Sequence, residues 1–348
     1  MAPERVPAES PATIGPDDAA RLMECLFGFV HTQALNTAID LGIPDVLADG
    51  ARSAADIAAT CATDVSATGR LLRCLVSAGA LAETEPGVLA LTSWGRCLQS
   101  GVAGGSKEYV QYICRYTTTA AAYLTDLVVS GRSGEPFEKA NGKPFFQFMA
   151  EDPVAGASFD AAMASSLSGL RDGVVAWRWD TVSTVVDVGG GNGTLIVELL
   201  RRSDHLTATL CEQEHVLPAA ARVLAAAGLT ERCALQPGDF FRAVPAGGDV
   251  YVLARILHDW DDRQAARILA NVRAAMAPHA RLLIAEHVLS GGPGPHWSKA
   301  YDLFMTMLLP GHERDRRQWT ALLESAGFGI EQISAAGWRS SVLECRPR

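Results

Sequence analysis

Alternating glycines mark the clearest candidate for a cofactor site in this sequence. Asp187-Val-Gly-Gly-Gly-Asn-Gly193 follows the β-branched run 182–188 and precedes a helical pattern at 194–200. A strand, a glycine loop and a helix in this order open a nucleotide-binding α/β fold. The dinucleotide fingerprint G-x-G-x-x-G does not fit, because Thr194 and Ile196 stand where its last glycine is needed. The pattern D-x-G-x-G-x-G suits S-adenosylmethionine, which has no pyrophosphate and lies against backbone that carries no Cβ atoms.

Acids at the ends of the next two predicted strands fit the same ligand. Glu212 ends the strand at 207–210 and could accept both ribose hydroxyls. Asp239 could accept the adenine amino hydrogens while Phe240 stacks on the ring; an ordinary turn aspartate beside a core aromatic is the alternative. The candidate cofactor-binding residues are therefore Asp187, Gly189, Gly191, Gly193, Glu212, Asp239 and Phe240.

A histidine follows the fourth predicted strand, 249–253. This position puts His258 at the carboxyl edge of the sheet, where open α/β folds bind their ligands. Histidine is the side chain best suited to moving a proton near neutral pH. It is one of eight histidines, however, and its position also suits a loop residue before the helix that Asp261 or Asp262 caps.

These segments, and above all Leu257-His258-Asp259-Trp260-Asp261-Asp262, resemble the plant-type (caffeic acid type) O-methyltransferases. Bacterial relatives in that family modify antibiotics and other secondary metabolites. The resemblance extends over nearly the whole chain from about residue 19. It implies a homodimer with an N-terminal helical dimerisation domain. The implied catalytic domain is α/β, a Rossmann-like class I methyltransferase fold with a seven-stranded, mostly parallel sheet.

The resemblance also assigns the chemistry. It makes His258 the base that removes the proton of a phenolic hydroxyl, which then attacks the methyl group of S-adenosylmethionine in line. Glu286 and Glu313 match the two acids that orient this histidine. Asp259 is expected to brace the loop or to approach the cofactor amine, and we count it with the substrate-binding candidates.

One position departs from the family pattern. A lysine often stands four residues before the histidine, near the cofactor, whereas this chain has Ala254 followed by Arg255. We expect either that Arg255 takes over the cofactor contact or that backbone alone makes it.

A segment rich in Phe and Met, residues 137–163, is the candidate wall of an acceptor pocket. Core packing is the default role of such residues, but they also suit a flat aromatic ligand. The acceptor-binding candidates, in addition to Asp259, are Phe146, Met149, Phe159, Met163, Met305 and Met307.

The N-terminal part of the chain predicts the plan of a winged helix. A helix capped by Ser53, a second helix that ends at Gly79, and a hairpin around the turn 83–87 follow one another. Glu83 and Glu85 at the hairpin tip would repel a phosphate backbone, so we favour a dimerisation scaffold over DNA binding. The predicted division is a disordered tail at 1–18, the winged-helix dimerisation domain at 19–100, linking helices that contribute to the acceptor pocket at 101–175, and the catalytic domain at 176–348.

Composition sets the outer limits. The chain has 348 residues, a net charge of −9 and a pI near 5.4, the opposite of the balance expected for a nucleic-acid binder. Eight scattered cysteines without a Cys-x-x-Cys pair indicate reduced thiols in the cytoplasm. No metal, membrane or nucleic-acid partner is expected. The alternatives are a family member with changed chemistry (N-methylation, decarboxylation or hydroxylation) and a winged-helix DNA-binding regulator.

Overall fold

The computed structural model describes residues 15–348 except 103, 167, 338 and 339, and gives no side-chain surroundings for 166, 168 and 169. The chain forms two compact units, residues 1–107 and 108–348, each described by itself below. Most of the tail expected at 1–18 lies outside the described residues; helix α1 begins at Pro16. The four-part domain division stays a prediction.

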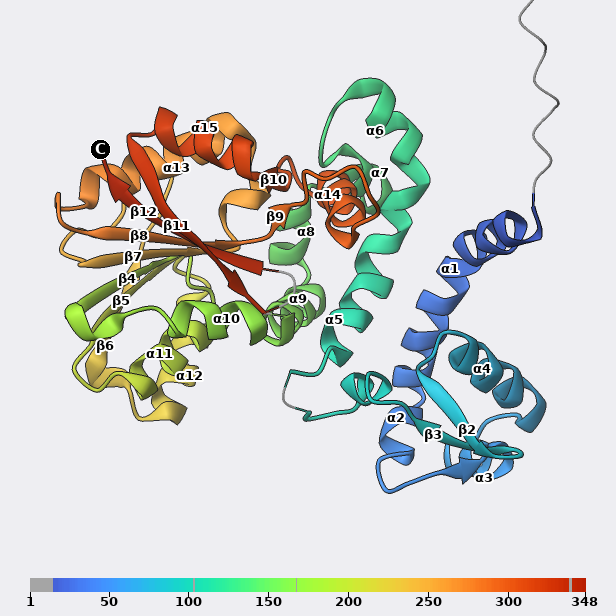
Figure 1. Cartoon of the computed structure of the whole chain (residues 1–348). Helices are drawn as coiled ribbons and strands as arrows, with labels where there is room; N and C mark the ends of the chain where they lie inside the picture. Colours follow the sequence, from blue (N-terminus) through green and yellow to red (C-terminus); the bar gives the residue numbers. More distant parts are fainter. Residues whose placement is uncertain (1–14, 103, 167, 338–339) are drawn as a thin grey trace, which may run out of the picture. The chain divides into compact units, whose positions relative to one another are not determined.

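The first unit holds four helices followed by a hairpin (Figure 1). Helix α3 begins where the sequence predicts, because the side chain of Ser53 accepts a hydrogen bond from the backbone N–H of Asp56. The side chain of Asp64 caps α4 in the same way, by accepting the backbone N–H of Ala67. The helix–helix–hairpin order is as expected, whereas the winged-helix name stays a prediction. The elements are α1 (Pro16–Asp40), α2 (Ile43–Val46), β1 (Arg52–Ser53), α3 (Ala54–Thr60), α4 (Val65–Ser77), β2 (Leu81–Glu85) and β3 (Val88–Leu91).

The second unit is built on a seven-stranded sheet in the order β11-β12-β8-β7-β4-β5-β6. Strands β8, β7, β4, β5 and β6 pair in parallel, and β12 joins β8 and β11 antiparallel. The class I methyltransferase architecture is thereby confirmed. The strands are β4 (Thr184–Val188), β5 (Thr207–Glu212), β6 (Cys233–Pro237), β7 (Val250–Ala254), β8 (Arg281–Glu286), β11 (Phe328–Ala336) and β12 (Ser340–Pro347).

Helices cover both faces of this sheet (Figure 1). On one face α10 (Ser168–Val175), α11 (Thr194–Arg202) and α12 (Leu217–Ala227) enclose a core that includes Ile196, Leu199 and Leu210. On the other, α13 (Asp262–Ala275) and α15 (Arg316–Ser325) enclose a core around Tyr251 and Trp319. Because both faces are buried, the central strands are nearly continuous apolar runs.

A third group of helices packs around aromatic and methionine side chains. It includes α5 (Lys107–Tyr112), α6 (Leu124–Ser130), α7 (Glu135–Asn141), α8 (Phe145–Glu151), α9 (Pro153–Ser166) and α14 (Trp297–Leu308). Two short parallel strands, β9 (Val288–Leu289) and β10 (Arg314–Asp315), link the segment before α14 to the segment after it. They place Glu313 beside the end of β8.

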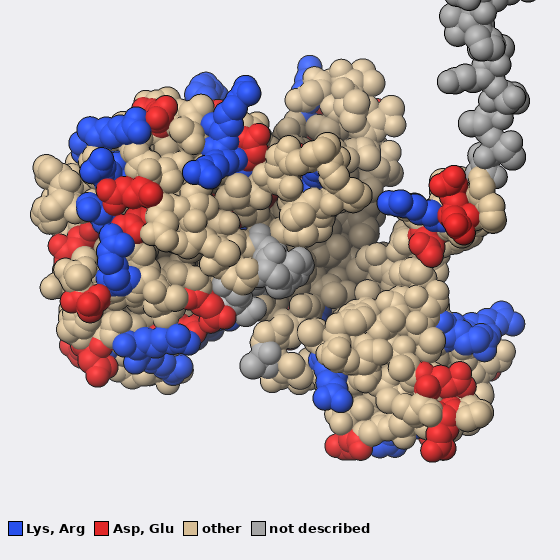
Figure 2. All heavy atoms as spheres, in the orientation of Figure 1, with Lys and Arg blue, Asp and Glu red and all other residues tan. Residues whose placement is uncertain are grey.

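Charged side chains of both signs are interspersed on the face shown in Figure 2. That face carries no continuous basic surface over either unit. Among the described residues, no helix has the length and apolarity that crossing a bilayer requires.

Candidate active site

The active-site candidate centres on His258, which is only 2% exposed. It lies in the one-turn helix Leu257–Asp259, directly after β7, at the carboxyl edge of the sheet. The ring nitrogen Nδ1 is 2.8 Å from Oε1 of Glu313 and 3.8 Å from Oε2 of Glu286. The two glutamates expected to orient His258 therefore both lie on the Nδ1 side of the ring.

Glu286 also holds the turn that carries His258. Its Oε1 accepts hydrogen bonds from the backbone N–H groups of Ile256 at 3.0 Å, Leu257 at 3.0 Å and His258 at 3.4 Å. Three N–H groups on one carboxylate favour its ionised form, whereas burial raises its pKa. Its second oxygen is buried without a hydrogen-bond partner.

Arg314 and Gly311 fix the same turn from the other side. The fully buried guanidinium of Arg314 donates to the carbonyls of Leu257 and Trp260, each at 2.9 Å, and pairs with Asp262 at 2.8 Å. Gly311 packs so closely that a Cβ there would lie 2.0 Å from the His258 carbonyl oxygen. Neither residue was expected from the sequence, although both belong to the segment 311–314 that supplied Glu313.

Asp259 reaches the opposite ring nitrogen, with Oδ1 3.3 Å from Nε2 of His258. Burial raises its pKa to about 7, and burial raises the pKa of Glu313 to about 8. His258 is thus enclosed by three carboxyl groups whose protons are energetically coupled. Such displaced pKa values near pH 7 are typical of sites that move protons.

The glycine loop lies at the same sheet edge, between β4 and α11. Gly189, Gly191 and Gly193 all have positive φ, at 73°, 55° and 76°. Side chains other than glycine rarely adopt these angles, which explains the alternating pattern in the sequence. No atom lies within 4 Å of the place a Cβ on Gly191 would occupy, so the loop is open toward a ligand there.

Glu212 stands at the end of β5, facing this loop. Its Oε2 accepts the N–H of Gly191 at 3.2 Å, and its Oε1 accepts the N–H of Gln213. Asp239 caps the following turn by accepting the N–H of Phe241 at 2.9 Å. Phe240 lies against the loop, 3.5 Å from where a Cβ on Gly189 would stand.

Two further candidates for cofactor binding, Asp187 and Arg255, contact other parts of the protein. The carboxyl of Asp187 is 1% exposed, and its Oδ2 lies 2.5 Å from the place a Cβ on Gly190 would occupy. Arg255 donates to the hydroxyl of Tyr301 at 2.5 Å and lies 3.3 Å from Nε2 of His287. A direct contact of either residue with the cofactor stays a prediction.

The acceptor-side candidates converge around one aromatic cluster. Met149 and Met305 are buried in it, and Phe159, Met163 and Met307 pack against it. Phe146 is 39% exposed and stacks on Trp260 at 5.7 Å, two residues from His258. The structure therefore gathers the Phe and Met candidates in one region, which reaches the turn of His258 through the Phe146–Trp260 stack. Which of them touch an acceptor is untested.

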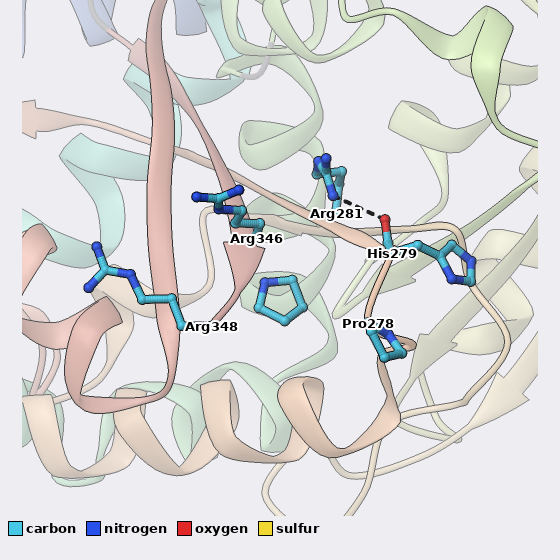
Figure 3. A pocket seen from close by; sticks show the side chains of 6 residues that line it. Pro278, His279, Arg281, Arg346 and Arg348 are labelled. Atoms are coloured by element: carbon cyan, nitrogen blue, oxygen red, sulfur yellow. Dashed lines mark hydrogen bonds between the residues drawn. The ribbon is translucent and has the colours of Figure 1, made fainter.

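A separate hollow of about 450 Å³ lies at the start of β8, opposite the edge that carries His258 (Figure 3). It is lined by Pro278, His279, Arg281, Arg346, Pro347 and Arg348. Its arginines are already paired: Arg281 and Arg346 with Glu331, and Arg348 with Glu324. We assign it no ligand. Within the described ranges, no group of three or more His, Cys, Asp or Glu side chains could hold a metal ion.

Comparison with known families identifies the chain. Residues 121–329 match the O-methyltransferase domain, and residues 23–101 match the O-methyltransferase dimerisation domain. The chain belongs to the O-methyltransferase family. The sequence prediction of the family, the enzyme class and the dimerisation domain is confirmed.

Similar proteins cover the chain almost end to end. A phenazine O-methyltransferase of Lysobacter antibioticus is 36% identical over 94% of this chain and 95% of its own length. An 8-amino-8-demethylriboflavin N,N-dimethyltransferase of Streptomyces davaonensis is 36% identical over 88% and 89%. An aclacinomycin 10-hydroxylase of Streptomyces purpurascens is 31% identical over 91% and 86%.

Solved structures of similar proteins support the predicted cofactor. A methyltransferase of calicheamicin biosynthesis, with S-adenosylhomocysteine bound, superposes with a TM-score of 0.86 at 29% identity, over 97% of this chain and 100% of that one. An O-methyltransferase of neocarzinostatin biosynthesis, in complex with S-adenosylmethionine and a hydroxy-methyl naphthoic acid, superposes at 0.76 with 30% identity, over 91% and 96%. S-adenosylmethionine as the methyl donor of this O-methyltransferase is thereby confirmed.

The residues present fit that donor. The loop is open at Gly191, the Glu212 carboxylate faces it from the neighbouring strand, and the aromatic ring of Phe240 borders it. An acid suits two ribose hydroxyls, and an aromatic ring suits the adenine face.

Replacing Glu212 by alanine should weaken binding of S-adenosylhomocysteine by about 10- to 100-fold, since hydrogen bonds to a charged group contribute about 1.5–3 kcal/mol. Isothermal titration measures this directly. Glu214→Ala, an exposed acid on the same loop, is the matched control and should bind as the wild type does. Equal affinity in the Glu212 variant would exclude the ribose contact.

Asp187 provides a test by pH. Burial, and next the neighbouring Glu212, raises the pKa of Asp187 to about 7 from 3.8. As pH rises, Asp187 therefore loses its proton in the unfolded chain at a lower pH than in the folded chain. The free energy of unfolding falls progressively for this reason between about pH 4 and pH 7. Asp187→Asn should be relatively more stable than the wild type as pH rises, with the difference levelling off above pH 7. Denaturant titrations of both proteins without ligand, at pH 5 and 8, measure it; a difference independent of pH would contradict the assignment.

Proposed function

We propose that this O-methyltransferase transfers a methyl group from S-adenosylmethionine to a phenolic hydroxyl of an aromatic or polycyclic secondary metabolite, with His258 as the general base. The observation that carries this proposal is the buried 2.8 Å contact between Nδ1 of His258 and Glu313, at the sheet edge that also carries the glycine loop. The names of the relatives, a phenazine methyltransferase among them, support an aromatic acceptor.

When bound, S-adenosylmethionine supplies an electrophilic methyl group on a sulfonium. The task of the protein is then to present the acceptor oxygen in line and to take its proton. A phenol has a pKa near 10 and is mostly protonated at neutral pH, so a base in contact with the hydroxyl accelerates attack.

His258 can act as that base through Nε2 when Nδ1 carries the ring proton. In this form Nδ1–H donates to an ionised Glu313, and Nε2, which lies 3.3 Å from Oδ1 of Asp259, carries the lone pair that takes the proton of the acceptor hydroxyl. After proton transfer the imidazolium is stabilised by Glu313 and Glu286 on one side and by Asp259 on the other. Glu286 keeps the turn, and with it Nε2, in a fixed position.

The assembly and location complete the proposal. We infer a homodimer, supported by the match to the dimerisation domain and by apolar side chains exposed along α1, including Leu22, Leu26 and Phe29. The eight cysteines are free, in keeping with the cytoplasm as the place of action.

The reaction class is tested by mass spectrometry of a panel of phenols, hydroxyquinones and aromatic amines incubated with enzyme and S-adenosylmethionine. A gain of 14 daltons on a phenol, at a site shown by fragmentation to be oxygen, supports the proposal. A gain on an amine nitrogen would instead place the chain with the N-methylating relative. Oxygen insertion, or cofactor binding without transfer to any acceptor, would align it with the hydroxylase.

Changing His258 to alanine should lower kcat by about 10²–10⁴-fold, the usual effect of losing a general base. Affinity for S-adenosylhomocysteine should stay near that of wild type, because the ring faces the acceptor side. His279→Ala removes an exposed histidine at the opposite edge of the sheet and is the control. If kcat of the His258 variant stayed within a few-fold of wild type, the base assignment would be wrong.

A further inference from the structure

Arg255 has an unusual backbone conformation for its residue type. Its φ is 57°, one of two positive values among non-glycine residues of the described chain. The conformation is held on both sides, because the Arg255 N–H donates to the carbonyl of Ala285 at 3.0 Å and the next three N–H groups bind Glu286. Such strain persists where the surroundings require it, often at functional sites.

This conformation directs the guanidinium toward a tyrosine and a histidine and not toward an acid. They are the Tyr301 hydroxyl at 2.5 Å and Nε2 of His287 at 3.3 Å, and the buried Nε has no hydrogen-bond partner. His287 in turn contacts the Ser340 hydroxyl through Nδ1. Within the part of the chain that the structure describes, Arg255 forms no direct ion pair. A buried charge without a direct counter-ion is costly, so its charge calls for a reason.

The carboxyl groups around His258 supply that reason. The guanidinium of Arg255 lies one ring away from His258, because His287, which it contacts at 3.3 Å, has its ring centroid 6.5 Å from that of His258. At this place the charge of Arg255 lowers the pKa of Glu286, Glu313 and Asp259 and so favours their ionised forms. Among the described residues, His287, Tyr109, Tyr112 and Tyr301 are further titratable groups that face it. Arg314, the second buried cation near Glu313, is already bound to Asp262 and to two carbonyls. Among the residues that the structure describes, Arg255 is therefore a cation near these carboxyl groups that is not already paired with an acid.

The protonation states of the His258–Glu313 pair show what this charge does. The form able to act as a base holds one proton, on Nδ1, beside an ionised Glu313. Adding a second proton gives either an imidazolium beside Glu313 or a protonated Glu313 donating to Nδ1 with Nε2 protonated. Neither of these can accept a proton at Nε2. A nearby positive charge favours the one-proton form, because that form is the more negative one.

We propose that Arg255 is a positioning residue for catalysis, whose unpaired guanidinium maintains the one-proton, base-competent form of the His258–Glu313 pair. This inference rests on the proposed role of His258. It places Arg255 on the acceptor side of the site, in contact with α14 through Tyr301, and gives it a role beyond replacing the family lysine at the cofactor.

The test is the pH profile of kcat at saturating cofactor and acceptor, for wild type, Arg255→Met and Arg255→Lys. Loss of the charge should move the acidic limb to higher pH by roughly one unit, the effect of removing one charge at several ångströms with an effective dielectric constant of about 20. Lysine restores the charge and should move the limb back. Tyr301→Phe removes a hydrogen bond to the guanidinium but no charge, and should leave the limb in place.

A second readout does not depend on turnover. With S-adenosylhomocysteine bound and histidine labelled with ¹⁵N, NMR reports which ring nitrogens of His258 are protonated, the signals being assigned by the His258→Ala variant. The Nδ1–H form should persist to lower pH in wild type than in Arg255→Met. If the methionine variant does not fold, Arg255→Gln is used in its place, because it removes the same charge.

The outcomes separate the two proposals. One outcome is that the acidic limb of kcat and the titration of the His258 ring are both present in wild type and lie at the same pH in the charge-loss variants. This result, even with a lower kcat, would overturn the role of Arg255 alone and assign its side chain to packing. If kcat of the wild type did not fall at acidic pH, the assignment of His258 as general base would be contradicted, and the inference about Arg255 with it.

Discussion

The whole site depends on one carboxylate that binds a run of backbone N–H groups. Strands β7 and β8 pair in parallel with Ala254 opposite Ala285, so the next residue of β8, Glu286, falls beside the turn that leaves β7. There it binds the N–H groups of Ile256, Leu257 and His258, which otherwise have no helix or sheet partner. The turn can leave the sheet edge sharply only because this acceptor is present. The left-handed Arg255 and the place of His258 follow from it.

This solution concentrates negative charge in a closed space. Glu286, Glu313 and Asp259 gather around one imidazole, and burial raises the pKa of each. The chain offsets the repulsion with N–H donors and with two arginines placed differently. Arg314 is tied to the turn itself, so its removal would disturb the geometry. Arg255 contacts a tyrosine hydroxyl and a histidine nitrogen, so in its proposed role its charge influences protonation without fixing a carboxylate in place.

Local patterns in the sequence predicted the features that depend on neighbouring residues alone. The alternating glycines marked positive φ angles, and β-branched runs marked buried strands. Ser53 and the pair Asp261-Asp262 marked helix starts, and the structure shows Asp261 as the cap of the second of these helices. The resemblance to the family supplied the two glutamates. What sequence reasoning missed depends on approach between distant segments. Gly311 is required by contact with the His258 carbonyl, and Arg255 meets Tyr301 across 46 positions of the chain. Arginine has no local preference for a left-handed backbone, so the direction of the Arg255 side chain could not be predicted from the sequence.

Some parts of the site suit every methyl transfer that this fold supports, whereas the His258–Glu313 pair suits one kind of acceptor. In the proposed roles, the glycine loop and Glu212 hold a methyl donor whatever the acceptor is. Relatives named as an N,N-dimethyltransferase and a hydroxylase match 88% and 91% of this chain. An aromatic amine attacks through a lone pair it already has and loses its proton afterwards, so it needs no base before attack. A phenol must lose its proton to become a strong nucleophile. Burial of the His258–Glu313 pair costs free energy, because two ionisable groups lose their hydration. Such a pair is useful chiefly for a phenol. The chemistry of the pair, more than the fold around it, favours the hydroxyl.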